Sequence, residues 1–199
     1  RSTLFPYTTL FRSPYRLIVR PRNASGRIPA LLQYTIYIDA ARNLADARRS
    51  ASNGYAGVLA LVRGKGCSPD EARIYERDSA DAAAVIDWLS TQPWSDGRVG
   101  MHGGSYSGFT QWAAAKRMPK ALKALFAGAS AAAGIDVPME GNVFWNFVYP
   151  FPFYTTNTKL LDDATYNDVE RWQRLDRNWY QSGRAYRDMD LYGDRKSVV

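Results

Sequence analysis

Cysteine and histidine are nearly absent from this sequence, whose 199 residues include one of each. A disulfide framework needs pairs of cysteines and a His/Cys zinc site needs several ligands, so both are excluded. The longest apolar run, 124–135, holds 12 residues, whereas a membrane helix needs roughly 20. Apolar residues still make up 46% of the chain, enough for a sizeable core. We therefore predict a folded protein without a membrane span.

The two ends of the chain differ from the sequence between them. Residues 1–13 match the translation of a common short-read sequencing adapter, and residues 194–199 match its reverse complement in another frame. We interpret both as adapter-derived and expect the native segment to be 14–193, cut at each end. The alternative for the first stretch is a flexible basic tail. On the first interpretation the true N-terminus is missing, so the sequence does not indicate a signal peptide or a cellular location.

The positive charge of the chain is concentrated partly in these ends. The formal net charge is +7, of which the two ends supply +3 and the intervening segment +4. The remaining basic residues are spread along the chain without a basic run, so we expect no nucleic-acid partner. The sequence does not indicate an oligomeric state.

Strand-like and helix-like segments alternate through the first two thirds of the chain. Predicted strands are 16–20, 29–37, 57–62, 98–102 and 122–129, and predicted helices are 40–52, 75–92 and 106–117. This alternation predicts an α/β fold with a mostly parallel sheet and flanking helices. The sequence from Ser68 to Glu71 resembles a capping box, which would start the second helix early.

The amino-acid composition of the sequence changes after residue 135. Residues 142–154 are dense in aromatic side chains, and 162–180 are polar with a helical pattern. We therefore expect a partial α/β core at 14–135 and the start of a helical cap at 136–193.

One motif carries chemistry: a predicted strand runs through Gly103, Gly104 and Ser105 into a helix. This is the layout of a nucleophile elbow, a tight turn that projects a serine hydroxyl above the sheet. Such a turn needs small residues two before and two after the serine, and Gly103 and Ser107 meet that need. The N–H of Tyr106, at the helix start, can then donate to an oxyanion. The alternative is an inert serine at a strand–helix junction; a dinucleotide loop is disfavoured by the glycine spacing and the lack of acids over 109–135.

The stretch 62–115 resembles the X-prolyl dipeptidyl-peptidase and cocaine esterase group of α/β-hydrolases. The resemblance rests on Arg-Gly-Lys-Gly-Cys-Ser at 63–68, Tyr-Glu-Arg-Asp at 75–78, Val-Ile-Asp-Trp-Leu at 85–89, Gln-Pro-Trp at 92–94, Gly-Arg-Val-Gly at 97–100 and Gly-Gly-Ser-Tyr-Ser-Gly at 103–108. It implies an α/β-hydrolase fold with Ser105 as the nucleophile and the Tyr106 N–H as half of the oxyanion hole.

The resemblance also implies a tyrosine hydroxyl as the other half of that hole, at the end of an early strand. Tyr37 occupies this place, although Ile36 stands where the family has proline and Tyr34 is a neighbouring alternative. A buried structural aromatic is the competing interpretation of Tyr37. The family's Asp and His follow far downstream of the serine, beyond the end of this chain, and we assign neither role to Asp136, Asp162 or Asp163.

Other candidate residues receive more ordinary interpretations. His102 is expected to be structural rather than a general base, because its strand should direct it away from Ser105. Cys67 is expected to be an inert thiol. Phe144 and Trp145 are candidates for the wall of a substrate pocket, with simple cap packing as the alternative. Glu140 followed by the neutral Asn142 disfavours the amino-acid ester hydrolase branch, which uses acids there.

Taken together, the resemblance implies an N-terminal fragment of a serine hydrolase. It would cleave small esters or X-Pro peptides through an acyl-enzyme, without a metal or organic cofactor. The chain by itself would be inactive, because the triad Asp and His are missing. The alternative is a non-catalytic α/β-hydrolase-like protein used for binding or as a scaffold.

Overall fold

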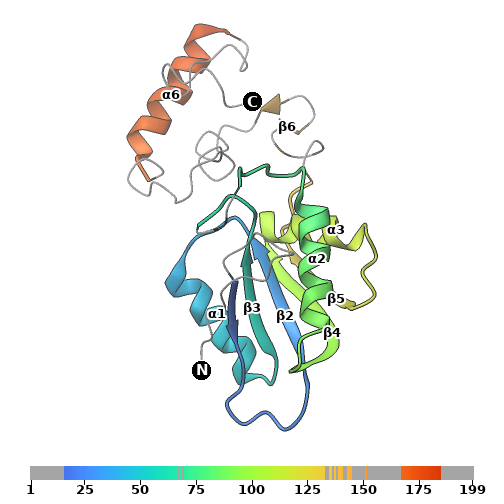
Figure 1. Cartoon of the computed structure of the whole chain (residues 1–199). Helices are drawn as coiled ribbons and strands as arrows, with labels where there is room; N and C mark the ends of the chain where they lie inside the picture. Colours follow the sequence, from blue (N-terminus) through green and yellow to red (C-terminus); the bar gives the residue numbers. More distant parts are fainter. Residues whose placement is uncertain are drawn as a thin grey trace.

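The computed structural model describes residues 16–66, 68, 70–132, 135, 137, 139–140, 143–144, 151 and 167–184. Five strands of this part form one sheet in the order β1-β3-β2-β4-β5 (Figure 1). They are β1 (Arg16–Val19), β2 (Ile28–Thr35), β3 (Ala56–Leu61), β4 (Ser95–Gly104) and β5 (Leu122–Gly128). β1 runs antiparallel to β3, and the other neighbours are parallel. The predicted α/β fold is confirmed.

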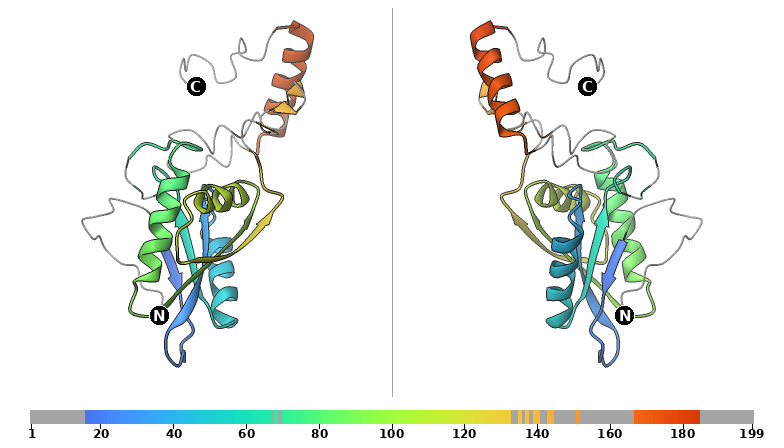
Figure 2. Two further views of the ribbon diagram at one scale, coloured as in Figure 1. Left: turned by 90° about the vertical axis from the view of Figure 1, so that its right-hand side faces the viewer. Right: turned by 90° about the vertical axis from the view of Figure 1, so that its left-hand side faces the viewer.

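Three helices connect the parallel strands and cover both faces of the sheet. α1 (Ala40–Ser52) lies on one face, and α2 (Asp78–Ser90) and α3 (Tyr106–Ala115) lie on the other (Figure 2). All six residues of β3 are buried, as expected of a central parallel strand covered on both sides. The main core joins the inward residues of β2, β3 and β4 to α2 and α3; among them are Leu32, Val58, Ile86, Leu89 and Met101.

Two predicted boundaries are wrong. The second helix begins at Asp78 and not at the predicted Tyr75, and the earlier start at the capping box of Ser68 fails as well. The helix cannot start earlier because of the backbone between Ser68 and Asp78. Asp70 and Tyr75 have positive φ angles of 71° and 70°, which a right-handed helix does not allow. The fourth strand begins at Ser95 and not at the predicted Arg98, because Ser95 is the parallel partner of Ile28.

The second part of the chain contributes shorter elements. β6 (Met139–Glu140) and β7 (Val143–Phe144) form an antiparallel pair, and α6 (Val169–Ser182) falls within the predicted cap. In Figures 1 and 2, α6 lies beyond the carboxyl edge of the sheet, apart from the helices that cover it. The division between core and cap remains a prediction. No helix within the described ranges is long and apolar enough to cross a membrane.

Candidate active site

Ser105 occupies a sharp turn between the last residue of β4 and the first residue of α3. Its backbone has φ 55° and ψ −123°, a conformation that costs a non-glycine residue about 1–3 kcal/mol. Hydrogen bonds on both sides hold it there: Ser105 N donates to the Gly128 carbonyl at 3.0 Å, and Phe109 N donates to the Ser105 carbonyl at 3.0 Å. The fold therefore maintains a strained, exposed serine at the carboxyl end of a central strand.

The small residues around Ser105 are required by close approach. Gly103 has a φ of +138°, and a Cβ placed on it would lie 2.5 Å from the Cβ of Ser107. A Cβ on Gly108 would lie 2.9 Å from the Cα of Ser130. The turn thus crowds β4 against α3 and α3 against the segment after β5, which explains the glycine spacing of the motif.

The Tyr37 side chain reaches Ser105 from the neighbouring strand. Its hydroxyl donates a hydrogen bond to Ser105 Oγ at 3.1 Å, although the two residues lie 68 positions apart in the sequence. Tyr37 follows the end of β2, and β2 pairs with β4, so the parallel register brings both strand ends to one edge of the sheet. Tyr106 is the first residue of α3, so its N–H has no acceptor within the helix. The structure therefore brings Tyr37, Ser105 and the Tyr106 N–H together.

Tyr34, the alternative to Tyr37, lies elsewhere. Its side chain is buried in the core and lines a cavity of about 10 Å³ together with Asp78 and Asp81. Burial, reinforced by the charges of Asp81 and Asp78, raises the pKa of Tyr34 well above its ordinary value. Because the Tyr34 side chain is buried in the core beside Asp78 and Asp81, the geometry leaves Tyr37 as the tyrosine at the exposed Ser105.

A buried carboxylate holds the side chain of Tyr106. The Tyr106 hydroxyl donates to Asp78 Oδ1 at 2.6 Å, and the Tyr75 N–H donates to Asp78 Oδ2 at 2.7 Å. Burial raises the pKa of Asp78 in spite of these two donors, and burial and the Asp78 charge together raise that of Tyr106 well above its ordinary value. Sequence reasoning gave Asp78 no role, and its only signal was its place at the end of the Tyr-Glu-Arg-Asp stretch.

His102 lies on the opposite face of β4 from the main core. Val99 and Met101 face α2 and α3, so the alternation of the strand turns His102 toward the α1 face, where Asp46 is the nearby charge. Burial lowers the pKa of His102, and Asp46 opposes this shift. Burial therefore disfavours the charged form of His102, which lies on a face of the sheet that does not carry α3.

The remaining sequence candidates are only partly covered by the structure. Cys67 and Trp145 lie outside the described residues, as do Asp136, Asp162 and Asp163. The backbone of Phe144 belongs to β7. Phe151, from the aromatic stretch, packs against the main core.

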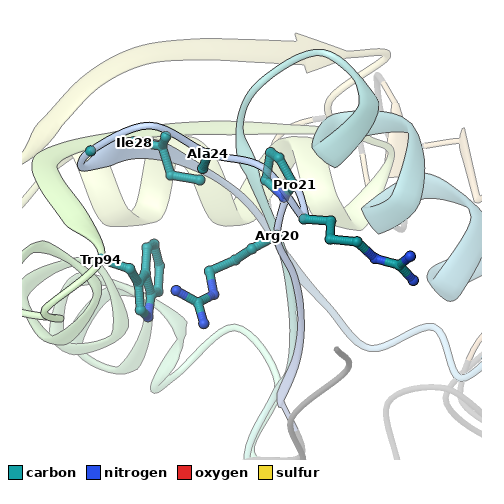
Figure 3. A pocket seen from close by; sticks show the side chains of 7 residues that line it. Arg20, Pro21, Ala24, Ile28 and Trp94 are labelled. Atoms are coloured by element: carbon teal, nitrogen blue, oxygen red, sulfur yellow. The ribbon is translucent and has the colours of Figure 1, made fainter.

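A hollow of about 490 Å³ lies far from Ser105. Its lining includes Arg20, Ile28 and Trp94, and the Arg20 guanidinium lies 5.7 Å from the centre of the Trp94 ring (Figure 3). Trp94 precedes β4 and Ser105 follows it, so the ten residues of the strand separate the two sites by about 30 Å. This hollow is at the amino edge of the sheet and contributes nothing to the serine.

The mostly parallel sheet with helices on both faces, and the strained serine between β4 and α3, define an α/β-hydrolase fold. A family model described as X-Pro dipeptidyl-peptidase (S15 family) matches residues 16–194. The chain belongs to this family, which confirms the resemblance inferred from the sequence motifs.

Individual relatives place the chain among hydrolases. It is 44% identical to the cocaine esterase of Rhodococcus sp. (strain MB1 Bresler) over 73 residues, which are 37% of this chain and 13% of the esterase. Among solved structures, an α-amino acid ester hydrolase is 25% identical with a TM-score of 0.61, over 72% of this chain and 28% of that one. An aminopeptidase from a marine sediment Thaumarchaeota archaeon shares the fold, with 22% identity and a TM-score of 0.61, over 91% of this chain and 38% of that one. The chain therefore matches only a minor part of each relative.

Proposed function

We propose that the protein to which this chain belongs hydrolyses esters or amides through a covalent acyl-enzyme on Ser105. The observation that carries the proposal is the 3.1 Å hydrogen bond between the Tyr37 hydroxyl and Ser105 Oγ, at a strained turn that exposes the serine. If Tyr37 were only a structural aromatic, its hydroxyl would not be expected to hydrogen-bond to the exposed Ser105.

The reaction follows from this arrangement. Ser105 Oγ attacks the substrate carbonyl carbon and gives its proton to a general base, and the carbonyl oxygen becomes an oxyanion. The Tyr37 hydroxyl and the Tyr106 N–H donate to that oxyanion, each worth about 3 kcal/mol in the transition state. The tetrahedral intermediate collapses, the leaving group departs with the proton, and the acyl group stays on Ser105. Water then gives a proton to the same base and attacks the acyl carbon. The bond between that carbon and Ser105 Oγ breaks, the acid product leaves, and the base returns the proton to Ser105 Oγ.

The general base of the proposed mechanism is a histidine other than His102. The sequence has a single histidine, His102, and it lies on the α1 face of β4 with a lowered pKa. We expect the 199-residue chain alone to be at most weakly active, and the triad Asp and His to be supplied by a further part of the polypeptide.

The substrate is a small ester or an X-Pro peptide. The family name points to X-Pro dipeptides, and the local identity to a cocaine esterase points to an ester. Phe144 and Trp145 are proposed to line the acyl or leaving-group pocket. The alternative function, a non-catalytic binding protein, would be favoured if no substrate is turned over.

The test begins with the source DNA, read past both ends of this sequence so that the full-length protein can be expressed. Wild type, Ser105→Ala and the matched control Ser130→Ala would be assayed with a fluorophosphonate probe, a nitrophenyl ester and an X-Pro nitroanilide. Ser130 is half-buried and lies beside the elbow at Gly108, so it controls for local disturbance. We expect Ser105→Ala to abolish labelling and to lower kcat by a factor on the order of 10⁴ to 10⁶. Unchanged turnover in that variant would refute the proposal, and an inert wild type would favour the binding protein.

A further inference from the structure

Two buried hydroxyl groups join the strand that precedes Tyr37 to the helix that follows Ser105. Thr35 is the last residue of β2 and is 0% exposed, and Ser107 is the second residue of α3 and is 1% exposed. Ser107 Oγ donates to Thr35 Oγ1 at 2.9 Å. The same threonine oxygen accepts a second hydrogen bond, from the backbone N–H of Tyr37, at 3.1 Å. One atom is thus shared by α3 and by the residue that reaches the serine.

These hydrogen bonds and the backbone between them form a closed loop around the site. The chain runs from Ser105 to Ser107, crosses the hydroxyl pair to Thr35, continues to Tyr37, and returns to Ser105 across the 3.1 Å hydrogen bond. The backbone of Tyr37 is held on its other side as well, because Asn43 Nδ2 of α1 donates to its carbonyl at 3.2 Å. The position of Tyr37 relative to α3, and so relative to the Tyr106 N–H, is therefore set through Thr35.

Packing alone does not require this polar pair. Valine has nearly the shape of threonine and would fill the same buried space, whereas a buried hydroxyl is costly unless it is hydrogen-bonded. The Thr35 hydroxyl also constrains geometry, because it holds two donors, Ser107 Oγ and the Tyr37 N–H, within hydrogen-bond distance of one oxygen atom. A displacement on the order of 1 Å in a catalytic group can cost about 100-fold in rate. The Thr35–Ser107 pair lies two residues from Tyr37 and two residues from Ser105, so a change in its geometry would displace both groups.

We propose that Thr35 is a positioning residue for the oxyanion hole, acting through Tyr37; the inference rests on the serine hydrolase activity proposed above. Thr35 contacts no substrate. It fixes the Tyr37 hydroxyl and the Tyr106 N–H in one frame, so that both donors meet the same carbonyl oxygen.

The experiment is a double-mutant cycle on the full-length enzyme, with kcat and KM measured for the ester. The variants are Thr35→Val, Tyr37→Phe, their combination, and Thr35→Ser, which keeps the hydroxyl. Thr110→Val serves as the matched control, because Thr110 is equally buried but its hydroxyl donates to the backbone carbonyls of Tyr34, at 2.8 Å, and Ser107, at 3.2 Å, and not to the Thr35 hydroxyl. Thermal unfolding of each variant reports on folding.

We expect Tyr37→Phe to lower kcat by about 100- to 1,000-fold and Thr35→Val by about 10-fold, both with little change in KM. In the Tyr37→Phe background, Thr35→Val should change kcat by less than about 2-fold, because the group that it positions is gone. Thr35→Ser should stay within about 3-fold of wild type. Thr110→Val should show the same factor in both backgrounds.

The remaining outcomes distinguish a failure of the positioning role of Thr35 from a failure of the proposed serine mechanism. If Thr35→Val lowers kcat by the same factor with and without the Tyr37 hydroxyl, or if Thr35→Ser fails to rescue a folded enzyme, Thr35 is only structural and the serine mechanism stands. If Ser105→Ala retains activity in the same assay, the proposed function falls and the positioning role falls with it.

Discussion

Replacing Gly103 with alanine should destabilise the chain far more than the same change at Gly97. Both glycines have positive φ angles, +138° and +85°, so alanine is strained at either position. A Cβ at Gly97 would meet nothing within 4 Å, whereas at Gly103 it would lie 2.5 Å from the Cβ of Ser107, which is fixed to the helix backbone. Conformational strain costs about 1–3 kcal/mol, and overpacking adds about 1–3 kcal/mol. We expect about 1–3 kcal/mol for Gly97→Ala, from strain alone, and about 2–6 kcal/mol for Gly103→Ala, from strain and overpacking together.

The assay is urea unfolding of this chain followed by far-UV circular dichroism, with the free energy of unfolding obtained by linear extrapolation. A second variant isolates the steric part: in a Ser107→Gly background, Gly103→Ala should cost about as much as Gly97→Ala, because the clashing Cβ is absent. The reasoning about the elbow is refuted if Gly103→Ala and Gly97→Ala differ by less than about 0.5 kcal/mol in the wild-type background.

Three further predictions follow from the groups around Ser105. Tyr106→Phe removes a hydroxyl donor from the buried Asp78 carboxylate, so the free energy of unfolding should fall by about 1–3 kcal/mol at neutral pH, measured by urea unfolding; no change would contradict a buried, ionised Asp78. Because the folded-state pKa of Asp78 is raised, its contribution to stability is greatest below the unfolded pKa of about 3.9 and is lost as pH rises through the folded pKa. Wild type should therefore lose stability relative to Asp78→Asn as pH increases from about 4, and a constant difference between the two unfolding curves would argue against it. In the full-length enzyme, Tyr37→Phe should lower kcat about 100- to 1,000-fold with little effect on KM, and a changed KM alone would indicate ground-state binding instead.

The α/β fold was predictable because its signals are local. The apolar run of β3 and the alternation of strands with amphipathic helices depend on residues near one another in the sequence, and the structure confirms both. The elbow was predictable for the same reason, since Gly103, Ser105 and Ser107 act within one turn.

Element boundaries were less predictable where tertiary pairing set them. β4 extends back to Ser95 because β2 offers it a partner at Ile28, and nothing in the local sequence carries that information. The start of α2 was predicted too early, at Tyr75 or at the capping box of Ser68, because neither pattern indicates the positive φ angles of Asp70 and Tyr75.

By itself, the sequence determined the parallel sheet, the position of the elbow and the choice of Ser105, since backbone propensity and side-chain size act over a few residues. Only the tertiary structure decided that Tyr37 rather than Tyr34 meets Ser105, that the Thr35 hydroxyl accepts hydrogen bonds from Tyr37 and Ser107, and that Asp78 accepts one from Tyr106. Tyr34 and Tyr37 are three residues apart and chemically identical. Which of them faces the core and which faces the serine depends on where β2 ends against β4, and strand register is a property of the assembled sheet.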